Sequence, residues 1–210
     1  MGDFITEKTK CGSCGRVCQQ KTPEVYITFG PCDLDTRPSH PARQNLPYEI
    51  NMCPHCGYVN TKLEKKIKGS KDIILEEDYI AIGKKKYPEA AEMYLKAAYL
   101  SKDNEDKFYH YLSAAWAFDD AGEEDNSVYA RTQAIEIGLK LKNQPDDFYL
   151  ILVDLYRKVK QFKEAKELLD SIEERLTGDL KTVAKFQKHL IKKKSALSYN
   201  LKEAREYEGK

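Results

Sequence analysis

Hydrophobic and polar positions alternate in two short stretches of the first 60 residues. In VYITF (residues 25–29) and YEINM (residues 48–52), every second side chain is apolar. A period of two is typical of a half-buried β-strand, so we predict two short strands. Between them, residues 30–47 are interrupted by prolines, which neither a helix nor a central strand accommodates. We predict a long loop there.

From residue 71 onward the apolar positions follow helical spacing instead. The clearest segment, residues 148–176, carries two successive apolar faces, formed by Tyr149, Leu152, Val153 and Tyr156 and then by Phe162, Ala165, Leu169 and Ile172. Two such faces in succession predict a helical hairpin.

Similar patterns precede this hairpin. Ala90, Ala130 and Ala165 occupy corresponding places and lie 40 and 35 residues apart. This spacing resembles that of tetratricopeptide repeats, whose period is about 34 residues. The resemblance covers roughly residues 71–191 and implies an array of helical hairpins. An irregular helical bundle is the alternative.

The amino-acid composition argues against a strongly basic nucleic-acid-binding protein and against a membrane protein. Hydrophobic residues make up 41% and charged residues 33%, and the formal net charge is +1. The first 70 residues hold 10 basic and 7 acidic residues, so this part is no polycation of the kind that phosphate backbones select. The sequence shows neither an apolar run long enough to span a bilayer nor a signal peptide, and we expect a cytoplasmic protein without membrane contact.

The six cysteines all lie before residue 57, and four of them form two matching pairs. Cys11-Gly-Ser-Cys14-Gly and Cys53-Pro-His-Cys56-Gly share a two-residue gap and a following glycine. A two-residue gap brings two thiolates to the separation that tetrahedral zinc requires, and the glycine allows the chain to turn behind them. The pattern predicts one zinc ion held by Cys11, Cys14, Cys53 and Cys56. Four cysteine ligands leave no open coordination position, so the site would be structural.

Two features compete with this interpretation. Cys-Pro-His-Cys alone also suits a thiol–disulfide redox pair using Cys53 and Cys56, although such a pair belongs at the start of a helix. The pairs are also separated by 38 residues, more than in compact four-cysteine sites. The entropic free-energy cost of closing a loop rises by only about 0.6 kcal/mol for each doubling of loop length. The long separation between the pairs therefore does not exclude a shared zinc site.

Other residues of this region have weaker interpretations. Cys18, Cys32 and His40 could contribute to a second metal site, but a lone cysteine is more often a small buried hydrophobe. The loop also carries a set of charged residues that could hold an anionic or peptide ligand: Asp33, Asp35, Arg37, His40 and Arg43. The alternative is that these charges pair among themselves and fasten the loop to the ribbon.

The cysteine pairs and the loop resemble a group of uncharacterised prokaryotic zinc-ribbon proteins that share a domain of unknown function. The residues that carry this resemblance are Cys11, Cys14, Asp33, Asp35, Arg37, Tyr48, Cys53, Pro54, Cys56, Gly57 and Tyr58. The resemblance implies zinc binding and an interaction role followed by helical repeats, and it implies no reaction.

Together these patterns predict an α+β protein that is mostly α. We expect a zinc ribbon over residues 1–66, tetratricopeptide-like hairpins over residues 71–200 and a frayed tail over residues 201–210. The predicted function is that of a non-enzymatic zinc-binding adaptor that holds a protein or peptide partner on its helical repeats. The alternatives are a zinc ribbon that binds nucleic acid, the redox protein, and an enzyme that uses the loop around Arg37.

Overall fold

The structure is a computed structural model, and it describes residues 4–207. Four short strands precede a helical body, so the protein is α+β and mostly α. Its residues form two compact units. The first unit comprises residues up to Ile27 together with Pro41–Ala130, and the second comprises Thr28–His40 together with residues from Arg131 onward. These units divide the chain elsewhere than the predicted modules do, because residues 28–40 belong with the C-terminal helices.

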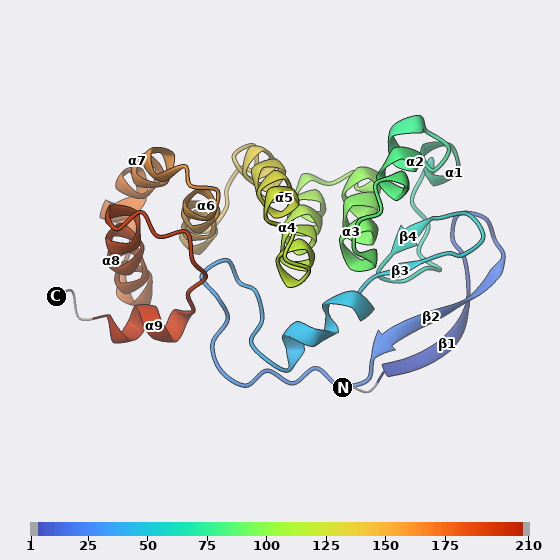
Figure 1. Ribbon diagram of the computed structural model, residues 1–210, viewed down its shortest axis with the longest axis horizontal. Coiled ribbons are helices and arrows are strands. Elements are labelled where there is room, and N and C mark those ends of the chain that lie inside the picture. Colours follow the sequence, from blue (N-terminus) through green and yellow to red (C-terminus); the bar gives the residue numbers. More distant parts are fainter. Residues whose placement is uncertain (1–3, 208–210) are drawn as a thin grey trace. The chain divides into compact units, whose positions relative to one another are not determined.

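The strands of the first unit form two separate antiparallel pairs (Figure 1). β1 (Phe4–Lys10) pairs with β2 (Val17–Pro23), and β3 (Asn51–Met52) pairs with β4 (Val59–Asn60). The predicted strand over residues 25–29 is wrong, because Pro23 ends β2 and the residues after it join no ladder beyond an isolated bridge at Thr28. The second predicted strand forms only at residues 51–52, because the proline-containing 3-10 helix η1 (Ala42–Tyr48) takes its first residue.

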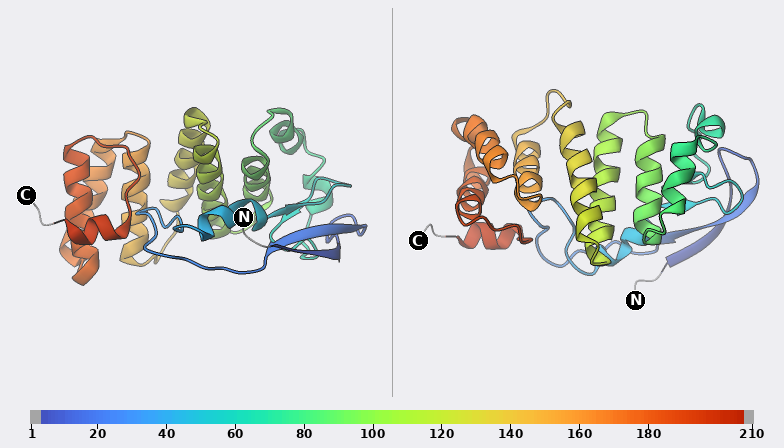
Figure 2. Two further views of the ribbon diagram at one scale, coloured as in Figure 1. Left: turned by 60° about the horizontal axis from the view of Figure 1, so that its bottom comes forward. Right: turned by 45° about the horizontal axis from the view of Figure 1, so that its top comes forward.

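Helices of the first unit follow the strands along the chain. They are α1 (Ser70–Ile73), α2 (Glu77–Lys84), α3 (Glu89–Leu100), α4 (Asn104–Asp120) and the first part of α5 (Glu124–Gly138). α3 and α4 pack along each other as a hairpin, which all views show (Figures 1 and 2). The Asp103 carboxylate caps α4 by accepting hydrogen bonds from the backbone N–H groups of Glu105 and Asp106.

The anchor alanines follow the predicted pattern with one exception. Ala130 and Ala165 are fully buried, whereas Ala90 is only half-buried and its neighbour Ala91 is fully buried. The small residue that close helix packing requires therefore lies one position later in the first segment than predicted.

The second unit contains the helical hairpin predicted for residues 148–176. α6 (Asp146–Lys158) packs against α7 (Phe162–Ile172), and η2 (Glu173–Arg175), α8 (Gly178–Lys192) and α9 (Leu201–Glu206) complete the unit. We expected residues 201–210 to fray, but the first six form α9. Asn200 and Glu203 make a reciprocal capping box at its start, which satisfies backbone N–H groups that would otherwise lack partners. Residues 208–210 lie outside the described part of the chain.

The loop segment Thr28–His40 is part of the core of the second unit. Leu34 is 4% exposed and lies in one apolar cluster with residues of α6, α7 and α8. Its backbone N–H donates to the Tyr199 carbonyl at 2.9 Å, and the Leu201 N–H donates to the Cys32 carbonyl at 3.0 Å. The segment is therefore held by main-chain bonds as well as by its side chains.

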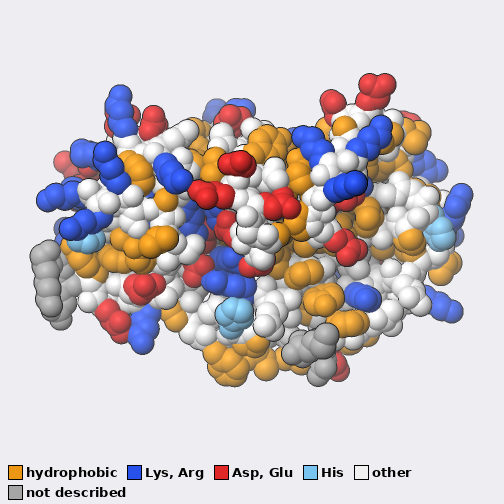
Figure 3. Space-filling model, viewed as in Figure 1, with side chains coloured by type: hydrophobic (Ala, Val, Ile, Leu, Met, Phe, Trp, Pro, Cys, Tyr) orange, Lys and Arg blue, Asp and Glu red, His pale blue; other side chains and the backbone are white. Residues whose placement is uncertain are grey.

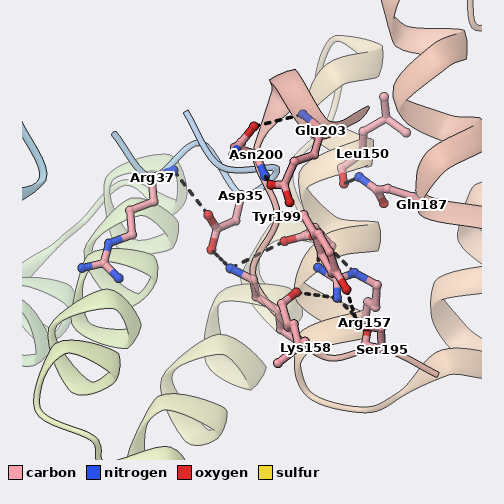
Figure 4. Close-up of polar contacts among 12 residues, drawn as sticks. Asp35, Arg37, Leu150, Arg157, Lys158, Gln187, Ser195, Tyr199, Asn200 and Glu203 are labelled. Carbon is pink, nitrogen blue, oxygen red and sulfur yellow. Dashed lines mark hydrogen bonds and ion pairs between the residues drawn. The ribbon is translucent and has the colours of Figure 1, made fainter. Parts of the chain in front are cut away.

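A buried ion pair also fastens this segment (Figure 4). The Lys158 ammonium donates to Asp35 at 2.7 Å, and the Arg131 guanidinium lies 4.0 Å from the same carboxylate oxygen. The Asp35 side chain is fully buried and those of Lys158 and Arg131 are nearly so. Lys158 also lies 3.8 Å from Asp154, which the Arg157 guanidinium contacts at 2.6 Å.

No helix among residues 4–207 is both long and apolar enough to cross a lipid bilayer. On the face drawn in Figure 3, basic, acidic and hydrophobic side chains are interspersed.

We predict that Asp35→Ala lowers the free energy of unfolding by about 3–5 kcal/mol, because it removes the buried carboxylate that pairs with Lys158 and lies beside Arg131. Urea unfolding of the full chain measures this loss. The matched control is Asp170→Ala, which removes the exposed Lys166–Asp170 ion pair and should cost about 0–1 kcal/mol. Equal losses in the two variants would contradict the role assigned to Asp35.

Candidate metal centre

The first cysteine pair lies in the turn between β1 and β2. The Cys11 N–H donates to the Arg16 carbonyl, and the Gly15 N–H donates back to the Cys11 carbonyl, each at 2.9 Å. Gly15 has φ +76°, a conformation that costs glycine little and other residues more. These bonds close a tight turn that presents Cys11 and Cys14 on the same side.

The second pair forms the same turn between β3 and β4. The Cys53 N–H donates to the Tyr58 carbonyl at 2.8 Å, and the Gly57 N–H donates to the Cys53 carbonyl at 2.9 Å. Gly57 has φ +73°. The two turns thus share their hydrogen-bonding pattern and the glycine conformation, as the matching sequences predict.

The two turns bring four sulfur atoms together. The Sγ atoms of Cys11, Cys14, Cys53 and Cys56 all lie within 4.8 Å of one another, and both the Cys11–Cys56 and the Cys14–Cys53 separations are 3.8 Å. A disulfide would require about 2.05 Å. Tetrahedral coordination with metal–sulfur bonds of about 2.3 Å gives sulfur–sulfur distances of about 3.8 Å. The four thiols therefore fit a shared metal ion and can hold one.

Backbone N–H groups of the turns help determine which thiols ionise. Burial acts to raise the pKa of Cys14, but hydrogen bonds from the Arg16 N–H and from the other cysteines outweigh it and lower the pKa to about 7. Burial raises the pKa of Cys11 and of Cys56, opposed by backbone donors of their own turns. Such N–H donors stabilise thiolates, which are the form that binds metal.

Surrounding contacts fix the turns in place. The Tyr79 hydroxyl donates to the Gly57 carbonyl at 2.7 Å, and the Gly12 N–H donates to the Leu63 carbonyl at 2.7 Å. A Cβ atom at Gly12 would come within 2.5 Å of the Lys65 carbonyl oxygen. Glycine is therefore required at this position, because the chain after β4 passes directly over the first turn.

The setting of Cys53 does not match that of a redox pair. Cys53 and Cys56 lie in a turn between two short strands and not at the start of a helix. His55, between them, is exposed, and its Nε2 lies 3.1 Å from the carbonyl of Val17, the first residue of β2, to which it donates a hydrogen bond.

Cys18, Cys32 and His40 do not gather into a second cluster. Within residues 4–207, the cysteines at 11, 14, 53 and 56 are the one group of three or more potential ligands close enough to share an ion. Cys18 is 6% exposed, and its thiol lies 3.8 Å from the Thr9 carbonyl. Burial raises the pKa of Cys18 to about 11, and it also raises the pKa of Cys32.

The predicted ligand loop is divided between the two units. Asp33, Asp35 and Arg37 are buried in the second unit, where His40 is exposed, whereas Arg43 is half-buried in η1 of the first unit. Pairing of the loop charges was expected to fasten the loop to the ribbon. Asp35 instead pairs with α6, because Leu34 beside it is drawn into the apolar core of that unit.

Sequence patterns missed a groove in the first unit. Four tyrosines from α3, α4, α5 and the turn before α3 line it, namely Tyr87, Tyr99, Tyr111 and Tyr129. Tyr129 is 50% exposed and Tyr111 is half-buried, so both present part of their rings to the groove. Exposure of this kind has no signature in the sequence, because tyrosine suits both a core and a surface.

The fold and the cysteine cluster together define the class of protein. It is a mostly helical α+β protein with a four-cysteine cluster that could hold a metal ion. Compared with known proteins, the sequence matches no family model and no curated protein, and the structure matches no solved structure. The resemblance to the zinc-ribbon group therefore depends on the quoted motifs alone.

Cys14→Ser and Cys53→Ser should each abolish stoichiometric metal binding, since each removes one of the four sulfur ligands. Elemental mass spectrometry on the purified full chain measures the metal content. Cys18→Ser and Cys32→Ser are the matched controls and should retain the wild-type content. Loss of metal in Cys18→Ser together with retention in Cys14→Ser would contradict the assigned ligand set.

Proposed function

We propose that the protein is a non-enzymatic adaptor, in which one structural zinc ion folds the cysteine-containing part and the helices bind a protein partner. The observation that carries the adaptor role is the groove lined by Tyr87, Tyr99, Tyr111 and Tyr129, which we call the tyrosine groove. We assign no reaction to the metal, because four cysteine ligands leave no coordination position for a substrate.

Zinc is the metal that suits this donor set. A tetrahedral site of four thiolates is typical of zinc or of iron–sulfur clusters, and a single ion at sulfur–sulfur distances of 3.8 Å suits zinc. When bound, zinc would supply cross-linking and no catalysis. The strands around it are two to seven residues long and bury little apolar surface, so metal binding would be needed to hold them.

The tyrosine groove fits an extended peptide segment of a partner. Its volume is about 330 Å³, and apolar side chains such as Ile82 and Leu95 line it beside the tyrosines. The Tyr99 hydroxyl donates to Glu76 at 2.6 Å, which orients that ring, and the Tyr87 ring packs edge-on against Phe118. Rigid aromatic side chains bind peptides at low entropic cost because few torsions have to be fixed.

The charged side chains that line the tyrosine groove indicate which kind of peptide would bind there. Lys85 and Asp78 both line it, and the Lys85 ammonium lies 5.8 Å from the centre of the Tyr87 ring. A peptide with apolar side chains for the aromatic surface and a carboxylate to pair with Lys85 would match these groups. The helical hairpins α3–α4 and α6–α7 and the buried Ala130 and Ala165 support a tetratricopeptide-like array, a class that binds peptides in this way.

Purified protein should contain about one zinc ion per chain, and chelation should release β3 and β4 from hydrogen-exchange protection. The expectation follows because zinc supplies on the order of 10–16 kcal/mol of folding free energy in small metallodomains. Amides of α6 and α8, in the other unit, serve as the internal control and should stay protected. Protection of β3 and β4 that survives complete chelation would contradict a structural role for the metal.

Tyr99→Ala combined with Lys85→Glu should abolish selection of peptides from a random displayed library by the full chain, because it removes an aromatic wall and reverses the charge at the groove. The matched control is Lys163→Glu, an exposed lysine of α7 whose side chain is 81% exposed. Binding of the same peptides by both variants would count against the tyrosine groove as the binding surface.

A further inference from the structure

A second pocket of the first unit is lined by basic side chains. Its volume is about 360 Å³, and it lies among β4, the segment after it and the turn between α3 and α4. Four lysines line it, Lys65, Lys66, Lys68 and Lys102, and all four are exposed at its rim. We call it the lysine pocket. The total net charge of +1 gives no hint of this local excess of positive charge.

A serine–histidine pair lies in the wall of the lysine pocket. Ser101 Oγ lies 2.8 Å from the Ala97 carbonyl and 2.9 Å from His110 Nδ1. A hydroxyl has one proton, which it donates to the carbonyl, so the hydroxyl oxygen accepts from Nδ1–H. The proton of the neutral ring is thereby placed on Nδ1, and Nε2 carries the lone pair. The pair orients His110 as a hydrogen-bond acceptor for a hydroxyl or amino group.

Burial of His110 favours the neutral form of its ring. Burial lowers its pKa; Asp106 acts against this shift and Lys65 adds to it. The ring also lies 6.4 Å from that of Tyr94, centre to centre, which packs it against α3. The pocket thus combines exposed ammonium groups at its rim with the hydrogen-bonded ring of His110 in its wall.

The acidic residues of the pocket do not cancel this charge. Asp103 and Asp106 are the two that line it, against four lysines. The carboxylate of Asp103 already accepts two backbone N–H groups at the start of α4, at 2.8 and 3.2 Å. The apolar side chains of Val59, Ile67 and Leu100 complete the lining. An anion with an apolar or planar part would match both the lysine rim and the apolar lining of the pocket.

The lysine-bearing wall is anchored to the cysteine turns. The Tyr58 hydroxyl donates to the Lys65 carbonyl at 2.7 Å, and the Leu63 N–H donates to the Gln20 side chain at 2.9 Å. The main chain that carries Lys65, Lys66 and Lys68 therefore has a defined position, although the lysine side chains themselves are exposed.

We propose that the lysine pocket binds a small phosphorylated molecule, with its phosphate among Lys65, Lys66, Lys68 and Lys102 and its organic part against the apolar lining and His110. A phosphate group suits the lysines because several ammonium groups can donate to its oxygens at once. The volume of about 360 Å³ lies within the range of small-molecule sites and holds a molecule of mononucleotide size.

The test uses the full chain with inorganic phosphate, adenosine 5′-monophosphate and adenosine as probes, followed by amide chemical shifts at constant ionic strength. The monophosphate should bind saturably and more tightly than inorganic phosphate, and adenosine more weakly than either. Shifts should centre on residues 59–68 and 100–110. The variant Lys66→Glu/Lys102→Glu should weaken monophosphate binding by about tenfold or more, the factor that one charge-assisted contact contributes.

The control variant Lys163→Glu/Lys202→Glu reverses two exposed lysines of the second unit and should leave binding unchanged. If the control variant weakened monophosphate binding equally, the proposal would be overturned. Such a result would show that the overall charge of the protein, and not the lysine pocket, attracts the phosphate. Absence of saturable binding by both phosphate probes up to about 10 mM would overturn it as well, because even a weak specific site has a millimolar dissociation constant. Tighter binding of a single-stranded oligonucleotide that lacks a terminal phosphate would also overturn it, in favour of a backbone-binding surface.

Discussion

The approach of four sulfur atoms to one point is the constraint on which the N-terminal part of this protein depends. It joins a turn at residues 11–14 to a turn at residues 53–56, across strands that bury little apolar surface. Two contacts link the region of one turn to that of the other: His55 of the second turn lies 3.1 Å from the Val17 carbonyl at the start of β2, and the Gly12 N–H of the first turn donates to the Leu63 carbonyl after β4. A metal ion bound by the four thiols would hold the turns at that separation in the absence of a large core.

The long connection between the two turns has a structural reason. Residues 28–40 leave the first unit and complete the second, where Leu34 fills the apolar core and Asp35 pairs with Lys158. A loop confined to a small ribbon would not need this length. The buried Asp35–Lys158 pair costs much desolvation, and its value is in fixing where the segment docks, since an apolar contact alone is less specific.

The sequence predicted structure that depends on neighbouring residues better than it predicted contacts between residues far apart in the chain. The two cysteine turns follow from spacing, because each turn closes within six residues and its hydrogen bonds are local. The α6–α7 hairpin follows from its apolar faces for the same reason. The partner of Asp35 lies 123 residues away, and no local pattern contains that information. β1 and β2 were missed because FITEKTK and VCQQKTP lack an alternation of apolar and polar residues, although Cys18 and Gln20 of β2 are buried between exposed neighbours. The register of these strands is set by the cysteine turn that joins them.

Long-range folding also explains why the net charge of a segment did not predict where its charged side chains gather. The 10 basic and 7 acidic residues of the first 70 are nearly balanced, yet the chain after β4 is folded so that three lysines line one pocket with Lys102. That fold depends on Tyr58, whose hydroxyl holds the Lys65 carbonyl and whose own carbonyl accepts from Cys53. One residue thus connects the cysteine cluster to the lysine-bearing segment, so loss of the cluster geometry would also move the wall of the pocket.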